Sequence, residues 1–187
     1  MKEILKPAFR LFVIAVVAAA LLGGTYLLTK GPIEEHELAA QTAARQAVLP
    51  DAVEFRSRFV EPTEGYEYIN EVYEGFDASG ELTGYTINMT AKGYNPDIVL
   101  TLGVDYNGVI TALNVGSNSE SPGLGANAAK PAFYGQFAGK TAGMSVTKGV
   151  PGENEISAIS GATITSEGIT DAVNGALEYF SKYIMVE

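Results

Sequence analysis

Cysteine is absent from this chain of 187 residues, and histidine occurs once, as His36. The lack of cysteine excludes thiol catalysis, disulfides, iron–sulfur clusters, c-type haem attachment and thiolate zinc sites. A lone histidine excludes a multi-histidine metal site, and its place between Glu35 and Glu37 indicates a solvated surface side chain, not a catalytic one. We therefore expect no metal site and no catalytic residue, and the chain has no redox group of its own.

Positive charge is scarce beyond the first 30 residues. The formal net charge is −10, from 12 basic and 22 acidic side chains. Within residues 1–30 the balance is reversed, since Glu3 is the one acidic residue there and the basic residues are Lys2, Lys6, Arg10 and Lys30. The remainder is strongly acidic and repels the phosphate backbone of nucleic acids, so DNA and RNA are not expected partners.

A run without charge, LFVIAVVAAALLGGTYLL, occupies residues 11–28. As a helix it would span about 27 Å at ~1.5 Å per residue, close to the ~30 Å hydrocarbon core of a bilayer. Basic residues precede the run and acidic residues follow it, which places the N-terminus in the cytoplasm by the positive-inside rule. We predict a single-pass anchor in the cell membrane. The alternative is a cleaved signal peptide, which has a shorter apolar core and a small-residue cleavage site.

Changes in composition divide the chain into three parts. We expect a cytoplasmic tip and transmembrane anchor at residues 1–30, a helical connector at 31–50 and an extracytoplasmic domain at 51–187. Residues 33–49 are rich in Glu, Ala, Gln and Arg, which predicts a helix that ends at Pro50. This helix forms a stalk or packs on the domain, and the sequence leaves both arrangements open.

The pattern of the domain predicts one α+β fold with an antiparallel sheet and a C-terminal amphipathic helix. Asn107-Gly108 is typical of a hairpin turn between two strands. Apolar residues recur at helical spacing near the end of the chain and predict a helix over 166–185. We expect a short helix at 131–137, and strands at residues 66–73, 85–92, 98–104, 109–115, 144–147 and 155–159.

Hydroxyl side chains gather just before that last helix, in the segment ISAISGATITSEGIT at residues 156–170. Thr165 or Ser166 would cap the helix, while Gly161 and Ala162 leave the backbone open to close approach. The start of a helix offers unpaired N–H groups and a positive dipole end, which favour a phosphate group. Taken alone, the segment favours an ordinary helix cap.

Three motifs in sequence order support a second interpretation. Ser160-Gly161-Ala162-Thr163 resembles the flavinylation motif of the FMN-binding domain family, and Glu120-Ser121-Pro122-Gly123-Leu124-Gly125 resembles the loop that precedes it in that family. Gly93-Tyr94 and the hairpin at Asn107-Gly108 stand at similar positions. The resemblance covers most of residues 65–185. Within the family, the layout is most similar to G subunits of Rnf-type ion-translocating electron transport complexes.

The resemblance implies a covalent FMN, joined by a phosphoester to the Thr163 hydroxyl by a separate flavin transferase. A flavin carries one or two electrons, while the protein orients it and tunes its potential. The implied function is electron relay in a ferredoxin:NAD oxidoreductase complex coupled to ion movement, with the other subunits as partners. The chain departs from the family at Ser157, where the extended motif has an acidic residue.

Further cofactor-binding roles follow from the same resemblance. The backbone at Gly123, Leu124 and Gly125 would approach the flavin ring, or Gly125 would belong to a plain surface loop. Glu120 would form a hydrogen bond with the flavin or be a solvated loop carboxylate. Tyr94 would flank the ring or pack in the core, and Thr165 would lie near the phosphate or cap the helix. The remaining candidates are Ser121, Ser160, Gly161 and Ala162.

Two other functions stay open at this level. The chain would also suit a C-type subunit of a sodium-translocating NADH:quinone reductase, or a stand-alone extracytoplasmic flavoprotein. A function of another class is a non-redox binding module tethered to the membrane, in which the hydroxyl segment serves as a helix cap.

Overall fold

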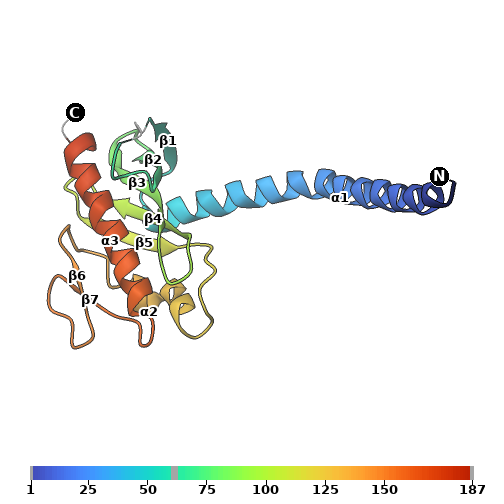
Figure 1. Ribbon diagram of the computed structural model, residues 1–187. Helices are drawn as coiled ribbons and strands as arrows, with labels where there is room; N and C mark the ends of the chain where they lie inside the picture. Colours follow the sequence, from blue (N-terminus) through green and yellow to red (C-terminus); the bar gives the residue numbers. More distant parts are fainter. Residues whose placement is uncertain (1, 60–62, 186–187) are drawn as a thin grey trace. The chain divides into compact units, whose positions relative to one another are not determined.

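The computed structural model describes residues 2–59 and 63–185 (Figure 1). The chain forms two compact units, residues 1–42 and 43–187. Helix α1 (Lys2–Val48) supplies the first unit, and its last turns belong to the second. The predicted helix over residues 33–49 is present as the last part of α1, which is continuous through Pro32 and ends at Val48. Proline removes one backbone hydrogen bond, but it does not end this helix.

Helix α1 contains a segment long and apolar enough to cross a membrane, and none of its most apolar window is buried within the chain. Its threonine hydroxyls are paired within the helix. Thr25 donates to the Leu21 carbonyl at 2.5 Å, and Thr29 donates to the Thr25 carbonyl at 2.9 Å. Such bonds satisfy polar groups that lipid cannot. Length, composition and this pairing together favour a membrane helix.

The end of α1 is part of the core of the second unit. Val48 and Leu49 are 1% and 3% exposed. The Thr111 hydroxyl donates to the Val48 carbonyl at 2.5 Å, across 63 residues of sequence. A Cβ at Gly75 would collide with the Leu49 side chain, so the glycine leaves the room that Leu49 fills. The last turn of α1 and the residue after it therefore pack against the sheet.

A five-stranded antiparallel sheet in the order β1-β2-β3-β4-β5 forms the centre of the second unit, which confirms the predicted antiparallel sheet. Alternate residues of its central strands, such as Ile87, Met89, Leu100 and Leu102, are fully buried in the main core. The strands are β1 (Glu54–Arg58), β2 (Ile69–Phe76), β3 (Leu82–Ala91), β4 (Ile98–Val104) and β5 (Ile110–Val115).

Two features of this sheet differ from expectation. Strand β1 was not predicted, because its sequence EFRSR lacks apolar alternation and its residues are largely exposed. Strand β2 begins at Ile69, not at residue 66, because a turn precedes it. Tyr66 N–H donates to the Thr63 carbonyl at 3.0 Å, and Ile69 N–H donates to the Tyr66 carbonyl at 2.9 Å.

Helix α3 (Thr163–Tyr179) lies along one face of the sheet and continues as one turn of π-helix, η2 (Phe180–Ile184) (Figure 1). Its buried stripe is the predicted apolar face, with Ile169, Val173 and Ala176 fully buried. The helix begins three residues earlier than expected. Ala162 occupies the N-cap position without a side-chain cap, so the prediction that Thr165 or Ser166 caps the helix is wrong.

The segment between β5 and α3 carries short elements. They are the 3₁₀ turn η1 (Gly125–Ala129), helix α2 (Pro131–Tyr134), and strands β6 (Ser145–Thr147) and β7 (Glu155–Ser157). The two strands pair in parallel. Asn174 of α3 fixes the entry to β6, since its Oδ1 accepts from the N–H groups of Gly143 and Met144 at 3.0 and 2.9 Å. The last two residues of β7, Ile156 and Ser157, are the first of the hydroxyl-rich segment.

Asp77 organises the turn between β2 and β3. Its Oδ1 accepts from the Ser79 hydroxyl at 2.7 Å and from the N–H groups of Ser79 and Glu81 at 2.8 and 2.9 Å. These bonds, that of the Ser79 hydroxyl foremost, hold the pKa of Asp77 below its ordinary value. The contribution of Asp77 to stability is therefore present above its unfolded-state pKa and is lost as the pH falls through its folded-state pKa.

Replacing Ser79 by Ala is expected to raise the pKa of Asp77 toward its ordinary value. The stability that Asp77 contributes, and that is lost as the pH falls, should then be smaller. An NMR titration of the Asp77 carboxyl carbon in both proteins measures the shift. Glu67, whose pKa is lowered by backbone donors in a different turn, is the internal control and should titrate alike in both. Identical titration of Asp77 with and without the Ser79 hydroxyl would contradict the assignment.

Candidate functional site

The turn before α3 is held by the helix it introduces. Ser166 accepts from the Ile159 N–H at 2.9 Å and donates to the Ala162 carbonyl at 3.0 Å, so one buried hydroxyl ties both ends of the turn. Gly161 has φ +74, a region that suits glycine, and Leu124 packs against it. The sequence Gly161-Ala162 thus permits a tight turn that presents Thr163 as the first residue of the helix.

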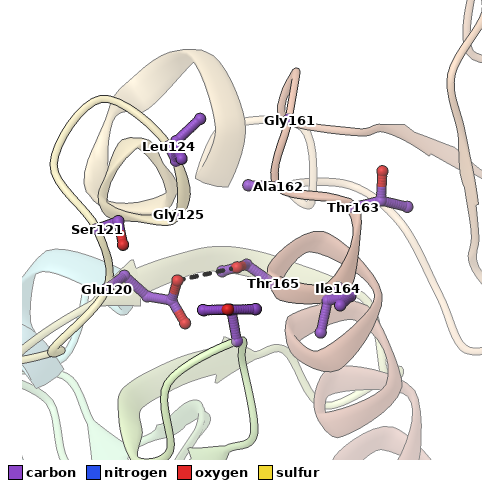
Figure 2. Close-up of a pocket in the computed structure, with 10 residues that line it drawn as sticks. Glu120, Ser121, Leu124, Gly125, Gly161, Ala162, Thr163, Ile164 and Thr165 are labelled. Carbon is purple, nitrogen blue, oxygen red and sulfur yellow. Dashed lines mark hydrogen bonds between the residues drawn. The ribbon is translucent and has the colours of Figure 1, made fainter.

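A pocket of about 500 Å³ opens beside this turn. Three segments form its wall: the loop between β3 and β4, the loop that precedes η1, and the first turn of α3 (Figure 2). Its lining residues are Tyr94, Glu120, Ser121, Leu124, Gly125, Gly161, Ala162, Thr163, Ile164 and Thr165.

Glu120 joins the three segments from inside the wall. Its Oε1 accepts from the Asn95 N–H at 3.0 Å, and its Oε2 accepts from the Thr165 hydroxyl at 3.1 Å (Figure 2). A Cβ at Gly93 or at Gly125 would collide with these carboxylate oxygens. Both glycines are therefore required by the close approach of the carboxylate, whatever else the pocket holds.

The structure brings together nine of the eleven sequence-predicted site residues at this pocket. Ser160 and Gly123 lie in the same segments but do not line it. Sequence reasoning missed Ile164, an exposed apolar side chain on the rim, and Asn95, which acts through its backbone N–H. An apolar residue inside a polar motif was a signal for Ile164. A backbone donor leaves no side-chain signal, so Asn95 had none.

The six hydroxyls of the segment differ in how they are engaged, and that of Thr170 is buried and donates to the Ser166 carbonyl at 2.8 Å. Thr165 and Ser166 are fully buried, and their hydroxyls bond Glu120 and the turn. Ser157 and Ser160 do not line the pocket. Thr163 does line it, is half-buried, and directs its hydroxyl away from the Glu120–Thr165 pair (Figure 2). Thr163 is thus the hydroxyl of the segment that is both at the pocket and free for chemistry.

The pocket has two distinct electrostatic features: the start of α3, which favours a bound anion, and the buried carboxylate of Glu120. No side chain caps the first turn of α3, so its N–H groups and the helix dipole favour a negative group beside Thr163. Glu120 is the one charged residue among those that line the pocket. Within residues 2–59 and 63–185, no group of three or more His, Asp or Glu residues is placed to hold a metal.

Sequence comparison identifies the family that has this fold and pocket. Residues 93–178 match the FMN-binding domain, and residues 1–48 match the RnfG N-terminal region. The G subunit of the Na(+)-translocating ferredoxin:NAD(+) oxidoreductase complex of Acetobacterium woodii is 37% identical, covering 96% of this chain and 92% of that protein. The G subunit of the ion-translocating oxidoreductase complex of Methanosarcina acetivorans is 36% identical, covering 96% of both.

The chain therefore belongs to the family of G subunits of Rnf-type ion-translocating oxidoreductase complexes, which confirms the resemblance drawn from the motifs. Solved structures share the fold. The C subunit of the Na(+)-translocating NADH-quinone reductase of Parabacteroides distasonis superposes with a TM-score of 0.53 at 26% identity, over 63% of each chain. NqrC of Shewanella oneidensis gives 0.52 at 21% identity, over 70% of this chain and 67% of that one.

Proposed function

We propose that this chain is the electron-carrying flavoprotein subunit of a Rnf-type ferredoxin:NAD oxidoreductase complex, with FMN joined by a phosphoester to Thr163. The assignment to this complex rests on the similar proteins. Those of Acetobacterium woodii and Clostridium ljungdahlii are subunits of Na(+)- and proton-translocating ferredoxin:NAD(+) oxidoreductases. The observation that carries the linkage is the placement of Thr163, which lines the pocket while the hydroxyls of Thr165 and Ser166 are engaged in hydrogen bonds.

The residues present fit the cofactor. The pocket volume of about 500 Å³ lies within the ~300–1,000 Å³ of small-molecule sites. Thr163 would anchor the phosphate, and the uncapped start of α3 would stabilise its charge. Exposed apolar side chains on the lining, Tyr94, Leu124 and Ile164, would contact the ring. When bound, FMN supplies one- and two-electron redox chemistry that the chain's own side chains lack.

The membrane arrangement is part of the proposal. Helix α1 would anchor the chain among the other subunits, with its basic N-terminal residues in the cytoplasm and the FMN-binding domain outside. A covalent bond suits that side, because a dissociable flavin would be lost by dilution there. Maturation would need a flavin transferase that uses FAD as donor with a divalent metal. That enzyme would meet Ser157 in place of the family's acidic residue.

The alternative complex is a sodium-translocating NADH:quinone reductase, to whose C subunits the fold is similar. The match of residues 1–48 to the RnfG N-terminal region favours the Rnf-type assembly. A non-redox binding module would share the fold, but the open hydroxyl at the pocket would then have no use.

The test is the mass of the full chain expressed with and without a flavin transferase. With the enzyme, we expect a gain equal to one FMN joined with loss of water, and in-gel fluorescence under ultraviolet light after denaturation. Peptide mapping should place the adduct in residues 156–170. A chain that gains no mass beside an active transferase, while a related protein in the same cells does, would refute the covalent assignment.

A further inference from the structure

Glu120 is a carboxylate buried without a cationic partner. It is 7% exposed, and within residues 2–59 and 63–185 no lysine or arginine forms an ion pair with it. Burying a charge is costly unless hydrogen bonds or an opposite charge compensate for lost hydration. Here two donors, the Asn95 N–H and the Thr165 hydroxyl, replace that hydration.

Two loops of the chain pack closely around the Glu120 carboxylate. Gly93 and Gly125 lie so close to its oxygens that neither position has room for a Cβ. The Asn95 side chain donates to the Ser119 carbonyl at 2.8 Å and so joins the two loops, while the Glu120 N–H donates to the Asn118 side chain at 3.3 Å within its own loop. Two glycines and a set of loop hydrogen bonds therefore fix the position of the charge in the pocket wall.

The hydrogen bonds alone do not call for a charge. A neutral amide of the same length would offer an oxygen to the Asn95 N–H and a donor group to the Thr165 hydroxyl. What the carboxylate adds is a negative charge in a wall where water is largely excluded, so its field is weakly screened. That field acts on whatever fills the pocket, and it opposes the addition of further negative charge.

We propose that Glu120 lowers the reduction potential of the flavin anchored at Thr163, by placing a fixed negative charge in the wall of its pocket. This inference rests on the proposed FMN site. Thr165 and Asn95 position the carboxylate, and the uncapped start of α3 stabilises the phosphate. Different groups therefore hold the two negative charges of the site. Reduction adds electrons beside an existing anion, which shifts the equilibrium toward the oxidised flavin.

The experiment compares flavinylated full-length protein in detergent as wild type, Glu120→Gln and Thr165→Val. Intact mass first gives the flavin content of each, and spectroelectrochemical titration then gives the midpoint potential. Glu120→Gln removes the charge and keeps an acceptor, so we expect a more positive potential. The expected change is at least tenfold in the two-electron equilibrium constant, about 30 mV. Thr165→Val removes one hydrogen bond and keeps the charge, so its potential should move less.

The possible results test the proposed function and the role of Glu120 separately. Wild-type protein without FMN would overturn the proposed function and this inference together. Flavinylated Glu120→Gln with the wild-type potential, or an equal shift in Thr165→Val, would overturn this inference alone and leave Glu120 a positioning residue. If Glu120→Gln does not fold, Glu120→Met fills the same volume without charge and should shift the potential in the same direction. Failure of both variants to fold would assign Glu120 to stability and refute the proposal.

Discussion

Thr163→Val is expected to abolish the covalent FMN while leaving the domain folded. Valine keeps the β-branched shape of threonine and is also restricted at χ1, so the first turn of α3 loses an oxygen and little else. The Thr163 hydroxyl makes no hydrogen bond to another described residue, and Ala162, not Thr163, holds the N-cap position. We expect flavin content to fall from full to none and the unfolding free energy to change by about 0.5 kcal/mol or less. Intact mass and urea unfolding of flavin-free protein measure the two effects.

Ser160→Ala is the matched control for that loss. It removes a hydroxyl from the same motif, three residues earlier, at an exposed position that does not line the pocket. Its flavin content should stay at the wild-type level. An adduct that persists in Thr163→Val and disappears in Ser160→Ala would move the attachment point and contradict the argument from accessibility. Loss in both variants would indicate damage to transferase recognition of the whole segment.

The sequence carried enough information to predict the membrane helix, four strands of the main sheet and the final helix. Each rests on a local pattern: an uncharged run in α1, apolar or β-branched stretches in β2 to β5, and helical spacing in α3. Strand β1 has no such pattern, because it lies at the sheet edge and only its pairing with β2 holds it. Its existence depends on a partner strand that local periodicity does not reveal.

The start of α3 shows a second limit of local reasoning. Ser166 and Thr165 resemble caps because hydroxyl residues are common there. In the structure both are inside the helix, and each hydroxyl is taken up by a tertiary or turn contact, with Glu120 and with the Ile159–Ala162 turn. Glu120 is 45 residues away from Thr165 in sequence. A contact of that separation takes up the Thr165 hydroxyl, and no local capping rule includes it.

The candidate site was predictable in outline because three motifs marked three segments that meet. Nine of the eleven predicted residues line one pocket, although they come from two loops and a helix start. The roles within the site were less accessible. Glu120 was expected to bond the flavin, and in the structure each of its oxygens already accepts a donor from the chain. Whether Glu120 bonds the flavin or the chain depends on distances in the folded protein, which the composition and order of the residues do not specify.

Gly168→Ala is expected to be the most damaging small substitution in α3. By helix propensity alone, alanine at an interior position would gain about 0.5–1 kcal/mol over glycine. In the structure, however, a Cβ at Gly168 would collide with the backbone carbonyl of Lys92, just before the loop that forms one wall of the pocket. Backbone cannot rotate aside, so the helix must move off the end of β3. Overpacking of this kind costs about 1–3 kcal/mol, which outweighs the gain.

Gly175→Ala gives the matched comparison two turns further along the same helix. There a Cβ would meet the hydroxyl end of the Tyr68 side chain, which is able to shift or be trimmed. We expect a smaller loss in urea unfolding, and recovery to at least wild-type stability when Tyr68→Phe is combined with it. Gly168→Ala has no side-chain neighbour to trim and should resist any such rescue. If Gly168→Ala instead proves as stable as wild type, the contact between α3 and Lys92 is not tight. The pocket wall would then be free to adjust around its ligand.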